Sequence, residues 1–147
     1  MNDAVKTPKT IEELNLLADR VVDCIFSVHR TIGPGFAESV YELCLMEEFE
    51  LRGIKYESQL RLPVVYKGKT LKKSFRLDLL VEDEIILELK CASEIIPLFK
   101  AQLLSYMKMA HKRLGYVVNF NTPLMKYGLK RLRLDSGSGY IDIYNQD

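Results

Sequence analysis

Apolar residues recur at steps of three and four near the start of the chain and at steps of two in its middle. The first spacing predicts a helix from residue 11 to about residue 31. Thr10 and Glu13 form a capping box at its start. After the breaker Gly33-Pro34-Gly35, the apolar positions predict a second helix over about 36–51.

Alternation of apolar and polar residues predicts strands in the middle of the chain. Their expected ranges are 56–66, 71–81 and 85–91. Pro63 indicates that the first of them is an edge strand or is interrupted, because proline has no N–H to donate. A helix is expected next, with Ser93 as N-cap and Pro97 in its first turn.

The last third of the chain predicts further strands. Residues 114–120 form an apolar run typical of a strand buried in a sheet, 125–134 predict a strand or short helix, 136–139 a flexible turn, and 140–144 a terminal strand. This order predicts an α/β sandwich around a mixed sheet, in which a three-strand meander is followed by a crossover helix and a strand beside the third. We expect a flexible tail over 1–9 and a single domain over 10–147.

Two acidic residues are predicted to meet in the hairpin of the second and third strands. Folding it about Asp83 with a three-residue loop places Asp78 directly across from Glu88. Opposed like charges destabilise a sheet, so a cation is expected between them. Lys90 supplies one positive charge, and a divalent metal would supply more. The apolar residues of the second strand are expected to share one face: Phe75, Leu77, Leu79 and Val81.

An Asp followed by Glu-x-Lys on adjacent strands is the constellation of metal-dependent phosphodiesterases. Carboxylate oxygens suit Mg²⁺, which lowers the pKa of bound water and neutralises charge on a phosphate. A neighbouring lysine orients the water or stabilises the developing charge. If only these residues are considered, the alternative interpretation is a solvent-exposed hairpin edge that carries charges of both signs.

Composition narrows the functional classes. The 147-residue chain has a net charge of +1, so any contact with nucleic acid must come from a local patch. Three widely spaced cysteines argue against a disulfide framework or a zinc site. No signal-peptide core or membrane span is predicted, and we expect a cytoplasmic protein.

Other candidate chemistry is weak. The two histidines, His29 and His111, have no matching nucleophile motif, and no glycine-rich nucleotide loop is present. We interpret His29 as a packed residue at a helix end. Five basic residues gather around the first hairpin and are either phosphate contacts or solvated surface: Lys67, Lys69, Lys72, Lys73 and Arg76.

The segment Gly35-Phe36-Ala37-Glu38-Ser39-Val40-Tyr41 matches the signature of the GxxExxY proteins, a bacterial group of the PD-(D/E)XK nuclease superfamily. Asp78, then Glu88-Leu89-Lys90, then Gln102 and Tyr106 follow in the order of the superfamily motifs. The chain resembles this family over roughly residues 15–135. Leu77 stands where the nominal motif has proline, a position that touches no chemistry.

The resemblance implies a restriction-endonuclease-like three-layer core and a role for each motif residue. Asp78 and Glu88 would bind Mg²⁺ or Mn²⁺, with the Leu89 carbonyl as a third ligand and Glu38 completing the acidic cluster. Lys90 would be the catalytic lysine. The last two motif residues, Gln102 and Tyr106, would position the phosphate or the attacking water.

Three functions remain open at this point. The first is a metal-dependent nuclease acting on nucleic acid, with DNA as the expected substrate. The second is a non-catalytic nucleic-acid-binding or assembly module that keeps the fold. The third is a hydrolase of a small phosphodiester. A nuclease this small is expected to work as a homo-oligomer or with a protein partner.

Overall fold

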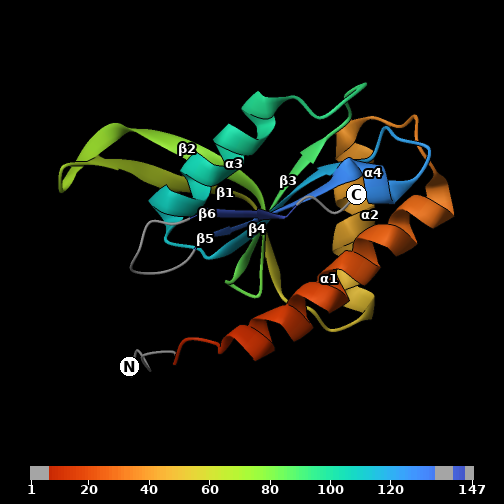
Figure 1. Ribbon diagram of the computed structural model, residues 1–147, viewed down its shortest axis with the longest axis horizontal. Coiled ribbons are helices and arrows are strands. Elements are labelled where there is room, and N and C mark those ends of the chain that lie inside the picture. Colours follow the sequence, from red (N-terminus) through yellow and green to blue (C-terminus); the bar gives the residue numbers. More distant parts are fainter. Residues whose placement is uncertain (1–6, 135–140, 145–147) are drawn as a thin grey trace.

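The structure is a computed structural model that describes residues 7–134 and 141–144. It contains a six-stranded sheet with helices on both sides (Figure 1). The elements are, in order, α1 (Ile11–Ile32), α2 (Glu38–Leu51), β1 (Tyr56–Tyr66), β2 (Lys69–Val81), β3 (Ile85–Lys90), α3 (Pro97–Ala110), β4 (Leu114–Asn119), α4 (Met125–Gly128), β5 (Leu129–Leu134) and β6 (Ile141–Tyr144).

The strands lie in the sheet in the same order as in the sequence. β1, β2 and β3 form an antiparallel meander, and β3 pairs with β4 in parallel after the crossover through α3. β5 and β6 then continue the sheet in antiparallel fashion. The predicted mixed sheet and crossover helix are therefore confirmed.

Two apolar cores make the fold three layers thick. On one face, α1 and α2 pack against Ile85, Leu87 and Leu89 of β3. On the other face, Leu103 and Met107 of α3 pack against Ile86 and other sheet residues. The two faces are visible in Figure 1, where α1 and α2 lie on one side of the strands and α3 on the other. This arrangement confirms the predicted α/β fold.

Several boundaries refine the predictions. α1 begins at the predicted capping box, in which Thr10 and Glu13 each accept a main-chain N–H from the other. The segment 125–134 holds both a short helix, α4, and a strand, β5. β6 occupies the predicted terminal strand, whereas residues 1–6 of the predicted tail and the predicted turn at 136–139 lie outside the described residues. No helix in the described part of the chain has the length and apolar character needed to cross a membrane.

The β2–β3 hairpin has the predicted register. Leu79 pairs with Leu87 and Val81 with Ile85, so the pairing is centred on Asp83. Glu82 and Asp83 both have left-handed φ angles, +52° and +57°, which close the turn in three residues. This tight turn fixes which residues of the two strands face each other.

The predicted common face of β2 is wrong. Leu79 and Val81 pack on the side of α1 and α2, whereas Phe75 and Leu77 pack on the side of α3. The change of side falls at Asp78. Gln59, which lies between the β1 partners of Leu77 and Leu79, has φ +53°, outside the β region. Regular alternation therefore fails at this point of the ribbon.

Candidate active site

A cavity of about 480 Å³ lies where the β2–β3 hairpin meets α2 and α3. Six predicted site residues line it, and they come from four different elements: Glu38, Asp78, Glu88, Lys90, Gln102 and Tyr106. The structure thus brings together every predicted side chain except that of Leu89. The Leu89 side chain points into the core between the sheet and α1/α2, so only its main chain is available to the cavity.

Asp78 and Glu88 connect β2 to β3 through their side chains. The Asp78 N–H donates to Glu88 Oε1 at 3.2 Å, and the Leu89 N–H donates to Asp78 Oδ2 at 2.8 Å. The regular pairing of the two strands stops one residue earlier, at Leu79 and Leu87. Carboxylates therefore take the place of main-chain carbonyls as acceptors, and one oxygen of each remains free of a main-chain donor.

Burial and the neighbouring Asp78 make Glu88 costly to ionise. Asp78 is 9% exposed and Glu88 is 4% exposed. Burial raises the pKa of Glu88 to about 8, and the negative charge of Asp78 acts in the same direction. The pKa of Glu38 is also raised, first by burial and then by Asp78. The cavity therefore favours either a proton or a cation beside these carboxyl groups.

Lys90 is held over the cavity by α3. Its ammonium donates to Gln102 Oε1 at 3.1 Å, and Gln102 Nε2 donates to the Tyr106 hydroxyl at 3.2 Å. The ammonium also lies 4.8 Å from the centre of the Phe99 ring. Gln102 and Tyr106 are one helical turn apart, so a single face of α3 orients the lysine.

The segment around Glu38 is anchored by a buried tyrosine. Tyr41 is fully buried and stacks on Phe120 with ring centres 4.3 Å apart. Its hydroxyl donates to the Gly33 carbonyl at 2.6 Å and accepts the Phe36 N–H at 3.2 Å. These contacts fix the loop that leads into α2, whose first residue is Glu38. Tyr41 therefore positions Glu38 from outside the cavity.

The change Tyr41→Phe should lower the free energy of unfolding by about 1 kcal/mol, because the Gly33 carbonyl and the Phe36 N–H both lose a partly buried hydrogen bond while the ring stacking is kept. Urea denaturation measures the change. Tyr127→Phe is the matched control, since Tyr127 is 58% exposed and its loss should stay within about 0.5 kcal/mol. Equal effects of the two changes would contradict the anchoring role.

The donor set suits a hard divalent cation. Asp78 and Glu88 offer carboxylate oxygens, which Mg²⁺ prefers and can share with water ligands. The pair is buried, and neither carboxyl group forms a salt bridge with a residue in the described part of the chain, which fits a cation at this point. Within residues 7–134, no three side chains of Asp, Glu, His or Cys lie close enough to hold a metal. Glu38 thus lines the cavity without forming a three-carboxylate cluster with the pair.

Four further residues line the cavity: Arg61, Ser74, Phe75 and Arg76. Of these, only Arg76 was a candidate from the sequence, as one of five basic residues that are either phosphate contacts or solvated surface. Arg61 and Arg76 are exposed and directly opposed across β1 and β2. The sequence shows both as basic residues of alternating strands, but only the β1–β2 register reveals that they face each other. Phe75 contacts the Tyr106 ring, with centres 5.1 Å apart, and so supports the α3 side of the cavity.

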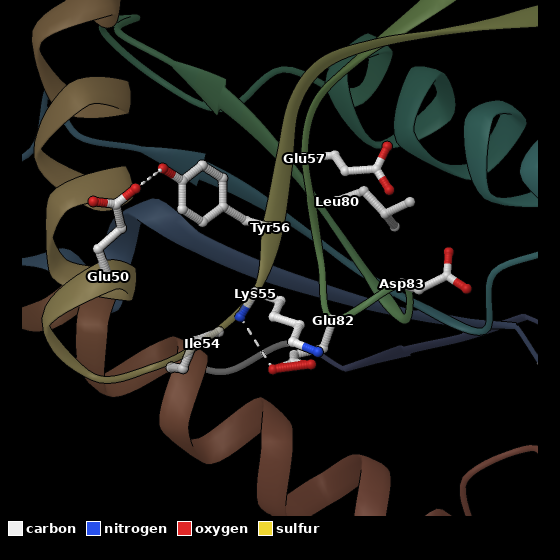
Figure 2. A pocket seen from close by; sticks show the side chains of 8 residues that line it. All are labelled: Glu50, Ile54, Lys55, Tyr56, Glu57, Leu80, Glu82 and Asp83. Atoms are coloured by element: carbon white, nitrogen blue, oxygen red, sulfur yellow. Dashed lines mark hydrogen bonds between the residues drawn. The ribbon is translucent and has the colours of Figure 1, made fainter. Parts of the chain in front are cut away.

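A larger cavity, about 620 Å³, lies at the opposite end of β1, and Figure 2 shows its lining. Two hydrogen bonds join polar groups that line it. Tyr56 donates to Glu50 at 2.8 Å, and the Lys55 N–H donates to Glu82 at 3.1 Å, both drawn as dashed lines (Figure 2). The smaller cavity, which holds the buried acids and Lys90, is therefore the candidate active site.

Comparison with known proteins identifies the superfamily of the chain. Neither the curated proteins nor the solved structures give a match. A family model, that of the PD-(D/E)XK nuclease superfamily, matches residues 15–132. The matched span contains all the elements that form the cavity, from α2 to α3. The chain belongs to the PD-(D/E)XK nuclease superfamily.

Proposed function

We propose that this protein is a metal-dependent nuclease that hydrolyses phosphodiester bonds of nucleic acid, with DNA as its substrate. The observation that carries the proposal is the buried, opposed pair Asp78 and Glu88 beside the ammonium of Lys90 in one cavity. Stability alone does not call for two adjacent buried carboxyl groups, since their burial opposes ionisation. Membership of the nuclease superfamily supports the same activity.

Each residue has a proposed role. Asp78 and Glu88 would hold Mg²⁺ or Mn²⁺, with the Leu89 carbonyl as a third ligand. Glu38, which forms no three-carboxylate cluster with the pair, would act on the ion through one of its water ligands. When bound, this cation supplies activation of water and neutralisation of phosphate charge. Lys90 orients the attacking water and stabilises negative charge on the phosphate.

The α3 residues act on the lysine and the substrate. Gln102 holds the ammonium of Lys90 in place through its 3.1 Å hydrogen bond. Tyr106, which hydrogen-bonds to Gln102, completes the wall of the cavity on this side and positions the phosphate. A phosphate group in the cavity would therefore lie between the acidic pair and α3.

Within the superfamily, we assign the chain to the GxxExxY group. Gly35 has φ +108°, a conformation suited to glycine, Glu38 lines the cavity, and Tyr41 anchors the loop between them. Each residue of that signature thus has a distinct physical role, since one makes a turn, one places an acid at the cavity and one anchors the loop.

The second candidate is a non-catalytic nucleic-acid-binding or assembly module. The lack of a three-carboxylate cluster in the described residues favours it. Under this alternative the two carboxyl groups share one proton instead of binding a cation. The protein then acts as part of an oligomer or with a protein partner. A hydrolase of small phosphodiesters is the third candidate.

We expect the purified protein to nick plasmid DNA in millimolar Mg²⁺ or Mn²⁺ and to lose this activity in EDTA. Calorimetric titration with each metal separates the candidates, because the nuclease must bind the ion and the binding module need not. Hydrolysis of bis(p-nitrophenyl) phosphate by a protein that leaves plasmid DNA intact would favour the third candidate, whereas hydrolysis of both substrates fits the nuclease. No metal binding at millimolar concentration, together with intact plasmid, would overturn the nuclease proposal.

A further inference from the structure

The paired ends of β1 and β2 form an arm that extends past the rest of the sheet (Figure 1). We define the basic arm as residues 61–76. Pairing of β2 with β3 stops at Leu79, so the arm has no third strand beside it. It grows directly out of the candidate active site, because Arg61, Ser74 and Arg76 at its base line that cavity.

Charge on this arm has one sign. It carries six of the 21 Lys and Arg residues of the chain and none of the 20 Asp and Glu residues. The rest of the chain therefore has fifteen basic and twenty acidic residues. The net charge of +1 thus hides an acidic body with a strongly basic projection. The six residues are Arg61, Lys67, Lys69, Lys72, Lys73 and Arg76.

These cations are free to bind an anion. All six are exposed, and none forms a salt bridge with another residue that the structure describes. Arg61 and Arg76 are cross-strand partners, and directly opposed like charges destabilise a sheet unless a counter-ion lies between them. The pair is the cationic counterpart of Asp78 and Glu88, and it borders the same cavity.

We propose that the basic arm binds the phosphodiester backbone of nucleic acid and directs it into the cavity, with Arg61 and Arg76 holding a phosphate at the cavity entrance. The inference deepens the proposed nuclease function, on which its second half rests. A regular series of phosphates is the partner that matches a row of unpaired cations, since such contacts supply most sequence-independent affinity.

The length of the arm sets an expected footprint. Lys73 lies five residues before Asp78, and Lys69 lies nine residues before it. At about 3.3 Å per residue, these positions are roughly 17 and 30 Å from the acidic pair along β2. With about 3.4 Å of helix axis per nucleotide, the arm would cover about five to nine nucleotides next to the scissile bond.

The test compares two double variants that remove the same charge. Lys72→Ala with Lys73→Ala alters the arm, whereas Lys55→Ala with Lys112→Ala alters the opposite end of β1 and β2, where Lys112 pairs with Asp83. Fluorescence anisotropy in EDTA measures binding without cleavage, using labelled single-stranded DNA, duplex DNA and RNA of about twenty nucleotides.

We expect the arm variant to bind about tenfold more weakly, and the slope of log affinity against log salt to fall by about two, because two phosphate contacts are lost. The control variant should match the wild type. Shortening the oligonucleotide to about four nucleotides should remove the difference between the arm variant and the control. The three labelled probes show which nucleic acid the arm prefers.

Two outcomes overturn the inference: equal affinity of the arm variant and the control, or binding to anionic lipid vesicles with no binding to any oligonucleotide. Hydrolysis of bis(p-nitrophenyl) phosphate distinguishes a failure of this inference from a failure of the proposed function. An arm variant that binds weakly but hydrolyses this small diester normally supports both. If the wild-type protein binds nucleic acid through the arm but hydrolyses no substrate, the inference about the arm stands and the proposed nuclease activity is wrong.

Discussion

Replacing Lys90 with methionine should lower the rate of the proposed metal-dependent cleavage by about a thousandfold, because the change removes the positive charge that would stabilise a phosphate in the cavity. Methionine keeps most of the aliphatic volume that packs near Phe99. The fold should therefore survive. Single-turnover cleavage of a labelled oligonucleotide measures the chemical step apart from binding.

The matched control for this change is Lys112→Met, which also removes a half-buried ammonium but lies at the β2–β3 turn beside Asp83. It should keep wild-type cleavage. Gln102→Ala should give a smaller loss than Lys90→Met, since the lysine keeps its charge and loses only its hydrogen-bonded orientation. Cleavage by the Lys90→Met protein at the wild-type rate would show that the activity belongs to a contaminant or that Lys90 has no part in it.

The second large expected effect is a dependence of the free energy of unfolding on pH, caused by Glu88. Its pKa is about 8 in the folded, metal-free protein, against an ordinary value of 4.5. Between these values the folded protein retains a proton that the unfolded chain has released. The free energy of unfolding therefore falls as pH rises, by up to about 1.4 kcal/mol for each pH unit. The stability that Glu88 contributes is fully present below its pKa in the unfolded chain. It is lost as the pH rises through the pKa of Glu88 in the folded protein.

Urea denaturation in EDTA at about pH 5.5 and about pH 7.5 tests this linkage, and the expected loss on raising the pH is roughly 2–3 kcal/mol. The Glu88→Gln variant is the control, because its amide cannot titrate and its stability should be much flatter over this range. Mg²⁺ should stabilise the wild type more at the higher pH, where less of Glu88 must give up a proton to bind it. A wild type that follows the same curve as Glu88→Gln would contradict the raised pKa.

The sequence was sufficient to predict the hairpin that carries the acids. Two constraints determine its register: the apolar faces must coincide, and the loop Glu82-Asp83-Glu84 must be short. Both are local, and the observed pairing of Leu79 with Leu87 follows from them. The placement of Gln102 and Tyr106 one turn apart on a helix was equally local, since it depends only on the helical period.

What the sequence could not show depends on contacts between distant segments. Leu77 and Leu79 lie on opposite sides of the sheet because the ribbon is irregular at Gln59 and Asp78, and no alternation pattern records such a distortion. The opposition of Arg61 and Arg76 requires the register of a long hairpin with an irregularity near Pro63. Their contribution to the cavity was therefore missed.

The start of α3 was also not predicted correctly from the sequence. Ser93 was expected to cap α3, but the helix begins at Pro97 and its N-cap is Ile96, which makes no side-chain cap. Proline is favoured at the first helical position, and this preference outweighed the serine four residues earlier. From this start, Gln102 lies in the second turn of the helix and Tyr106 in the third, and Gln102 contacts Lys90.

The two turns that bound β2 differ in how much change of length they can accept. An extra residue in the Glu82-Asp83-Glu84 turn would shift the strands by one position, rotate one carboxyl group to the other side of the sheet and separate Asp78 from Glu88. At Lys67-Gly68, the tip of the arm, added residues would only lengthen a solvent-exposed ribbon. In this architecture the length of the basic arm can therefore change while the acidic pair at its base keeps its geometry.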